Sequence, residues 1–105
     1  MTGAMFEKMV LSLPNTGLKP HFERIGYFVV GRRMFTTYLA KDNTANIFLS
    51  PEEQAVFCKM DPKNIYPVPN KWGDKGMTIF KLKDVDRDFV QEALVSAYHA
   101  VVTKK

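Results

Sequence analysis

The hydrophobic residues near the two ends of the chain repeat with helical spacing. In residues 2–13 the apolar positions are Met5, Met9, Val10 and Leu13. In residues 86–102 they are Val90, Leu94, Ala97 and Val101. Each set covers one side of a helix, so both segments are predicted to be amphipathic helices. We expect Pro14 to end the first helix, and Asp84 or Asp86 to cap the second.

The middle of the chain carries short runs of β-branched and aromatic residues. These runs are Phe22–Ile25, Tyr27–Val30, Met34–Ala40, Thr44–Leu49 and Met77–Leu82. We expect turns at Asn15–Gly17, Gly26, Gly31–Arg33 and Lys41–Asn43. Short strands separated by such turns are typical of antiparallel hairpins.

A short helix is predicted to interrupt the strands. Ser50 suits its N-cap, Pro51 its first position, and Glu53 completes a capping box. We expect this helix to end near Cys58, because the proline-bearing connection 61–69 forbids a long one. A loop over 70–76 then leads to the last strand.

The order of elements predicts an α+β domain: an antiparallel sheet with the N-terminal, short middle and long C-terminal helices packed on one face. A chain of 105 residues, 46% hydrophobic and 25% charged, fits a single domain over 1–105. Cys58 is the only cysteine, which excludes a disulfide-stapled module. Without a long apolar run or a signal-peptide pattern, we expect a cytoplasmic protein and no membrane partner.

The sequence contains no recognisable catalytic or metal-ligand constellation. His21 and His99 are far apart, and Cys58 is expected to be a buried, inert thiol. The acidic run Asp84–Asp88 resembles the start of a calcium loop, but Phe89 stands where that loop needs glycine. We therefore expect no enzyme, no cofactor and no metal.

The net charge of +4, with a pI near 9.3, is unevenly distributed. Residues 19–49 carry +3 and residues 59–83 carry +4, whereas 50–58 carry −2 and 84–105 carry −1. The excess of cations thus lies on the predicted strands and loops. Two basic hairpin regions suit contact with a phosphate backbone.

Four stretches, in this order, resemble the MmcQ/YjbR family of small bacterial proteins. They are Leu13–Thr16, Tyr27–Phe35, Ile47–Glu53, and Asn70–Thr78 followed by Ala93–Tyr98 and the terminal Lys104–Lys105. Gly17 and Leu18 replace an acidic pair that often follows the first stretch. The resemblance implies a CyaY-like (frataxin-like) fold and a DNA-binding role through a double wing of hairpins. The acidic, iron-binding ridge of frataxins is not expected, because Glu7 is the only acid in residues 2–13.

Charge and resemblance together predict a nucleic-acid site with DNA as partner. Its candidate residues are Arg32, Arg33, Lys71, Trp72 and Lys75. Arginines bind phosphates or guanine edges, and a tryptophan between lysines suits base stacking. In the competing interpretation, lysines on strands discourage aggregation and Trp72 anchors a core or loop.

The alternative function is a protein- or small-ligand-binding module with a pocket between the sheet and the Pro62–Pro69 connection. The aromatic residues available to line it are Phe22, Tyr27, Phe28, Phe35, Tyr38 and Tyr66. A sizeable apolar cavity would favour this alternative, whereas a continuous basic face would favour nucleic acid.

Overall fold

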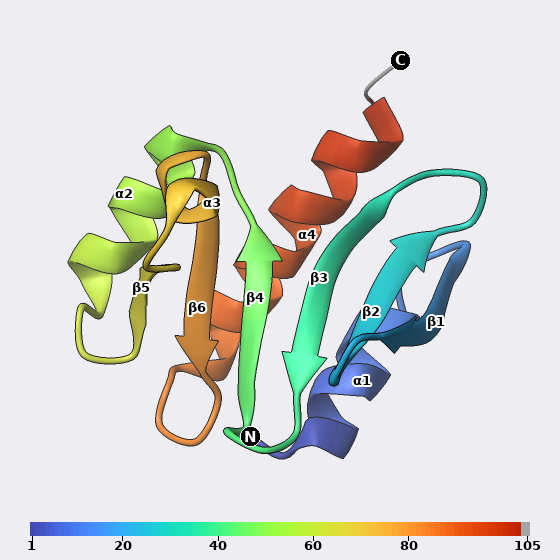
Figure 1. The fold of residues 1–105 in the computed structure, drawn as a ribbon, viewed down its shortest axis with the longest axis horizontal. Helices are drawn as coiled ribbons and strands as arrows, with labels where there is room; N and C mark the ends of the chain where they lie inside the picture. Colours follow the sequence, from blue (N-terminus) through green and yellow to red (C-terminus); the bar gives the residue numbers. More distant parts are fainter. Residues whose placement is uncertain (104–105) are drawn as a thin grey trace.

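The structure, a computed structural model, describes residues 1–103. In chain order the elements are α1 (Gly3–Leu11), β1 (Thr16–His21), β2 (Arg24–Val29), β3 (Met34–Leu39), β4 (Thr44–Phe48), α2 (Pro51–Met60), β5 (Ile65–Pro67), α3 (Lys71–Asp74), β6 (Met77–Lys81) and α4 (Arg87–Thr103) (Figure 1). Lys104 and Lys105, which belong to the family resemblance, lie outside the described residues.

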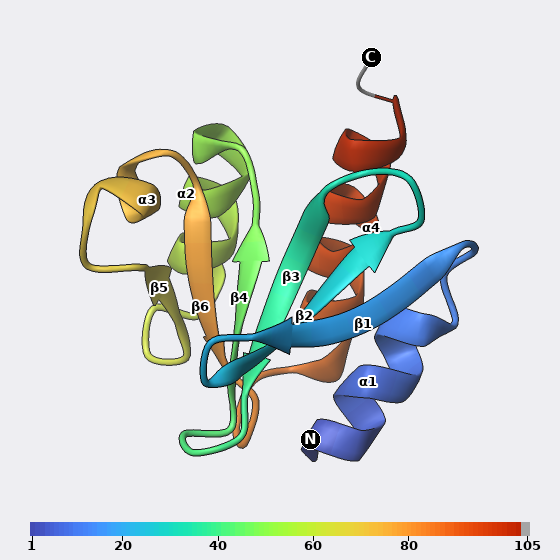
Figure 2. The ribbon, with the colours of Figure 1, turned by 45° about the vertical axis from the view of Figure 1, so that its right-hand side comes forward.

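One six-stranded antiparallel sheet, in the order β1-β2-β3-β4-β6-β5, organises the molecule. Helices α1, α2 and α4 lie on one face of this sheet, and β1 curves across the other face (Figures 1 and 2). The predicted α+β architecture is confirmed.

The core fills the space between the sheet and these helices. The predicted apolar face of α4 is buried as expected: Val90, Leu94, Ala97 and Val101. Helix α1 differs from the prediction, because Phe6 and Val10 are buried while Met5 is exposed. Phe6 packs against Tyr27 and Tyr38 of the sheet and takes the place expected for Met5, whereas the predicted Met9, Val10 and Leu13 do pack against the core.

The first hairpin also differs from the prediction. Residues 16–21, expected to begin as a turn, form β1, and Phe22 lies in the turn to β2. Gly26 does not break β2, because it pairs with Lys19 of β1 on one side and with Thr37 of β3 on the other. Asn15, with φ 59°, makes the turn before β1.

A β-bulge in β3 decides which side chains face the core. Phe28 pairs with Met34 and Tyr27 with Thr36, so Phe35 is the extra residue between them. Phe35 is fully buried, with its ring 5.9 Å from that of Tyr98 on α4. Met34 is left on the face away from the helices.

The predicted capping signals are confirmed. The Ser50 hydroxyl accepts from the Glu53 N–H, and the Glu53 carboxylate accepts from the Ser50 N–H, both at 3.1 Å. The Asp86 carboxylate accepts from the Asp88 N–H at the start of α4. Within residues 1–103, no helix combines the length and the apolar character needed to cross a membrane.

Candidate functional site

A cleft of about 950 Å³ opens at the end of the sheet where β3 and β6 begin and β4 ends. Met34, Phe48 and Met77 line it from neighbouring strands, and Phe48 pairs directly with Met77. Since Ala45 and Ile47 of β4 point into the core, Phe48 points away from it. The cleft therefore has apolar side chains from the open face of the sheet.

The β1–β2 turn forms one rim of this cleft. His21 pairs with Arg24, which leaves Phe22 and Glu23 as a two-residue turn. Phe22 has φ 59° and is 94% exposed, although its side chain lines the cleft. The His21 ring lies edge-on to it, with 4.9 Å between the centroids. A bulky residue in the left-handed region is a conformational outlier.

Helix α3 forms the opposite rim, where the sequence predicted only a loop. The Asn70 side chain caps it by accepting from the Trp72 N–H at 2.8 Å. Trp72 is 49% exposed and lines the cleft, so it is not the core residue that the competing interpretation allowed. The ammonium nitrogens of Lys75 and Lys71 lie 5.1 and 5.9 Å from the centre of its ring.

Three residues fix the position of α3. The buried Gln54 amide of α2 donates to the carbonyls of Gly73, at 2.9 Å, and Met77, at 3.1 Å. A Cβ at Gly73 would lie 1.8 Å from the Val68 carbonyl oxygen. Gly76 has φ 112°, and a Cβ there would lie equally close to the carbonyl oxygen of residue 49. The rim that carries Trp72 is thus rigidly attached to the sheet and to α2.

The two neighbouring arginines of the β2–β3 turn point to different places. Arg33 lines the cleft. Arg32 is not among the residues that line it, and its guanidinium donates to the Val101 carbonyl at 3.4 Å, in the last turn of α4. A cation there interacts favourably with the helix dipole.

The remaining side of the cleft is formed by the helices. Ser50 and Glu53 of the α2 N-terminus and Ala100 of α4 lie there. Glu53 is the single acid among the described residues that line the cleft. The Ser96 hydroxyl donates to its carboxylate, and this hydrogen bond, together with those from Ser50, holds the pKa of Glu53 below its ordinary value despite partial burial.

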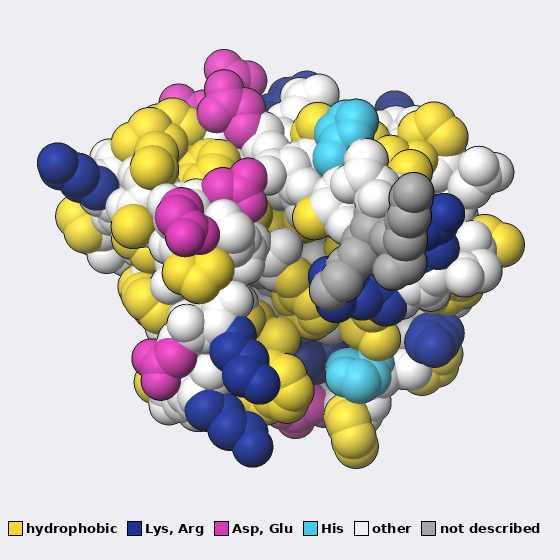
Figure 3. Space-filling view, turned by 90° about the horizontal axis from the view of Figure 1, so that it is seen from above, with side chains coloured by type: hydrophobic (Ala, Val, Ile, Leu, Met, Phe, Trp, Pro, Cys, Tyr) yellow, Lys and Arg dark blue, Asp and Glu magenta, His cyan; other side chains and the backbone are white. Residues whose placement is uncertain are grey.

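The predicted site residues are therefore partly brought together. Arg33, Trp72 and Lys75 line one cleft and Lys71 adjoins it, whereas Arg32 lies over α4. Seen from above, Lys and Arg side chains gather in the lower part around a hollow, and most Asp and Glu lie at the upper left (Figure 3). Sequence reasoning missed His21, and it named Phe22 only for the alternative pocket, because the expected strand at 22–25 hid the turn.

The other basic residues of the two charged segments lie elsewhere. Lys41, Lys63 and Lys83 are exposed. Lys41 follows β3, Lys63 precedes β5 and Lys83 follows β6, at the end of the sheet remote from the cleft, which is at the bottom of Figure 1. The charge excess is thus divided between the two ends of the sheet.

The cleft is not the alternative pocket expected from the sequence. The cleft is lined by no residue of the Pro62–Pro69 connection. Of the six aromatic residues proposed to line the pocket, Phe22 alone lines the cleft. Tyr27 and Phe35 are core residues, and the pKa of Tyr27 is raised by its burial and by its 2.8 Å hydrogen bond to Glu7.

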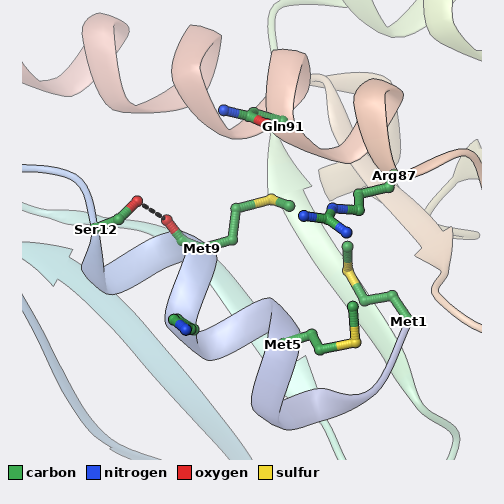
Figure 4. A pocket seen from close by; sticks show the side chains of 7 residues that line it. Met1, Met5, Met9, Ser12, Arg87 and Gln91 are labelled. Atoms are coloured by element: carbon green, nitrogen blue, oxygen red, sulfur yellow. Dashed lines mark hydrogen bonds between the residues drawn. The ribbon is translucent and has the colours of Figure 1, made fainter.

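A smaller groove of about 350 Å³ lies between α1 and α4. Met1 and Met9 point toward Arg87 (Figure 4). The lining residues are Met1, Met5, Lys8, Met9, Ser12, Arg87 and Gln91. Across residues 1–103, no three His, Cys, Asp or Glu side chains gather as a metal site requires. Burial raises the pKa of the half-buried Cys58 thiol, in the direction expected of an unreactive cysteine.

Comparison with known proteins reveals a fold likeness. No family model and no curated protein sequence matches the chain. The chain is similar to the crystal structure of protein DR2400 from Deinococcus radiodurans, described as a DUF419 domain. The TM-score is 0.80 at 22% sequence identity, over 99% of this chain and 80% of that one. The likeness shows that the two chains share a fold.

Proposed function

We propose that this domain binds nucleic acid at the cleft between the β1–β2 turn, the β2–β3 turn and α3. The observation that carries the proposal is the convergence of two basic segments that are far apart in sequence. Arg33 comes from one segment and Lys71 and Lys75 from the other, and each segment also brings an exposed aromatic residue to the rim. Cations that contact phosphates and rings that contact bases are the two requirements of such a site.

The resemblance to the MmcQ/YjbR family supports the same proposal, since it implies DNA binding through hairpins. Membership of that family is part of the proposal, and the fold likeness to a DUF419 domain is compatible with it. The proposed site uses the β1–β2 turn, the β2–β3 turn and the short helix α3. No catalytic step is assigned to it.

Two triple variants test the proposal. Arg33→Ala/Lys71→Ala/Lys75→Ala and Lys41→Ala/Lys63→Ala/Lys83→Ala each remove three positive charges from the net +4. The first set surrounds the cleft and the second lies at the remote end of the sheet. In fluorescence anisotropy at low salt, we expect the first variant to lose more than tenfold in affinity for DNA, and the second to change less than threefold. Equal losses would contradict a localised site.

A small anionic ligand with a flat ring is the second candidate. The volume of the cleft falls within the range of roughly 300–1,000 Å³ that small-molecule sites occupy, and Met34, Phe48 and Met77 give it apolar walls. Competition distinguishes the candidates: a mononucleotide that displaces a labelled oligonucleotide at micromolar concentration would favour the small ligand.

A further inference from the structure

We infer that the cleft takes single-stranded nucleic acid, with unpaired bases stacked on Phe22 and Trp72, in preference to a duplex. This inference rests on the proposed function and names the class of nucleic acid that the same site binds. It departs from the family resemblance, which implies hairpins that act as wings along DNA.

The first argument is the accessibility of the aromatic rings. Phe22 is 94% and Trp72 49% exposed, and both line the cleft from opposite rims. In a duplex the faces of the bases are covered by their neighbours, and only base edges are presented in the grooves. An unpaired base offers its whole face to an aromatic side chain. Two exposed rings at one cleft therefore suit unpaired bases.

The second argument is the shape and lining of the site. The cleft is concave, measures about 950 Å³ and is lined by Met34, Phe48 and Met77. Unpaired bases enter such a cleft and remove these side chains from water. A double helix keeps the faces of its bases stacked inside, so it cannot lay them against these side chains. The apolar lining would then stay hydrated and contribute nothing to binding.

The third argument is the arrangement of charge. Lys71 and Lys75 lie on the rim beside Trp72, and Arg33 lies on the β2–β3 turn. Glu53 occupies the side formed by the helices. A strand whose phosphates pass Arg33, Lys71 and Lys75 and whose bases turn inward keeps its own charges away from the Glu53 carboxylate.

The conformation of Phe22 is a further, independent observation. A phenylalanine with φ 59° is strained, and here its ring gains little burial in return. Such outliers persist mainly at functional sites, where the strained geometry presents a side chain. The turn presents the Phe22 ring to the cleft.

The sole tryptophan makes the inference directly measurable. Fluorescence excited at the red edge of the tryptophan band, where the four tyrosines do not absorb, reports Trp72 alone, and stacking of a base on it quenches that emission. A labelled 12-nucleotide single strand of mixed sequence is compared with its blunt 12-base-pair duplex in the same low-salt buffer. We expect at least tenfold tighter binding of the single strand, with quenching of Trp72 by the single strand only.

Two variants sharpen the comparison. Phe22→Ala is expected to weaken single-strand binding about tenfold and to change duplex binding less than twofold. Val56→Ala removes an exposed apolar side chain of α2 that does not line the cleft, and should change neither. Circular dichroism verifies that both variants are folded.

The outcomes separate the inference from the function on which it rests. If both forms bind equally, without quenching and without an effect of Phe22→Ala, the single-strand inference is wrong while nucleic-acid binding stands. If neither form binds at low salt, the proposed function is wrong and the inference falls with it.

Discussion

At the scale of single residues, Phe22 holds a conformation that its side chain disfavours. A left-handed backbone costs an L-residue with a Cβ about 1–2 kcal/mol. The edge-on contact with His21, at 4.9 Å, returns about 0.5 kcal/mol of this. The pairing of His21 with Arg24 imposes the two-residue turn, so the sheet register maintains the strain.

Replacing Phe22 should therefore separate stability from binding. Asparagine adopts the left-handed region at low cost, and we expect Phe22→Asn to raise the free energy of unfolding by about 0.5 kcal/mol. The same variant should weaken single-strand binding about tenfold. Urea denaturation and anisotropy measure the two effects. A loss of stability of 1 kcal/mol or more would show that the ring supports the fold.

At the scale of elements, α2 organises one side of the cleft through two neighbouring side chains. Gln54 attaches α3 through the Gly73 and Met77 carbonyls, and Glu53 accepts hydrogen bonds from Ser50 of its own cap and from Ser96 of α4. Because these hydrogen bonds hold the pKa of Glu53 down, folding favours its ionised form.

This stabilisation should depend on pH. It is fully present above the pKa of the unfolded carboxyl group, and it is lost as the pH falls through the lower native pKa of Glu53. We expect Glu53→Gln to cost about 1 kcal/mol at pH 7, as the loss of a cap does, and clearly less at pH 3. Urea denaturation at both pH values provides the measurement. Glu52→Gln, an exposed neighbour on the same turn, is the control, and a loss independent of pH would contradict the assignment.

At the scale of the whole molecule, the cations divide between the two ends of the sheet. Arg33, Lys71 and Lys75 surround the cleft, whereas Lys41, Lys63 and Lys83 lie at the remote end. Because the cations are divided in this way, the global charge of +4 does not by itself locate a partner.

The salt dependence of the binding constant should reflect the number of cations at the cleft that contact phosphates. Three neutralised phosphates on a single strand predict a slope of about −2 in a plot of log K against log[salt]. The cleft triple variant should bring this slope close to zero, whereas the variant at the remote end should leave it near −2. Anisotropy titrations at four salt concentrations measure it. Equal slopes for the two variants would indicate nonspecific attraction over the whole surface.

The sequence alone determined the elements whose signals are local. Ser50, Pro51 and Glu53 start α2 because a capping box needs only residues three positions apart. The buried face of α4 follows from helical periodicity, and the alternation of helices and strands predicts the α+β class.

The tertiary structure decided what depends on pairing between strands. It set the β1–β2 register, which places Phe22 in a turn, and the bulge that turns Phe35 into the core. It also brought Arg33 to the same cleft as Trp72 while Arg32 went to α4. Strand register depends on which faces of the strands are buried together. Within one strand, the side chains of adjacent residues point to opposite faces. Local pattern therefore predicted the basic segments, and only the fold could show which of their side chains meet.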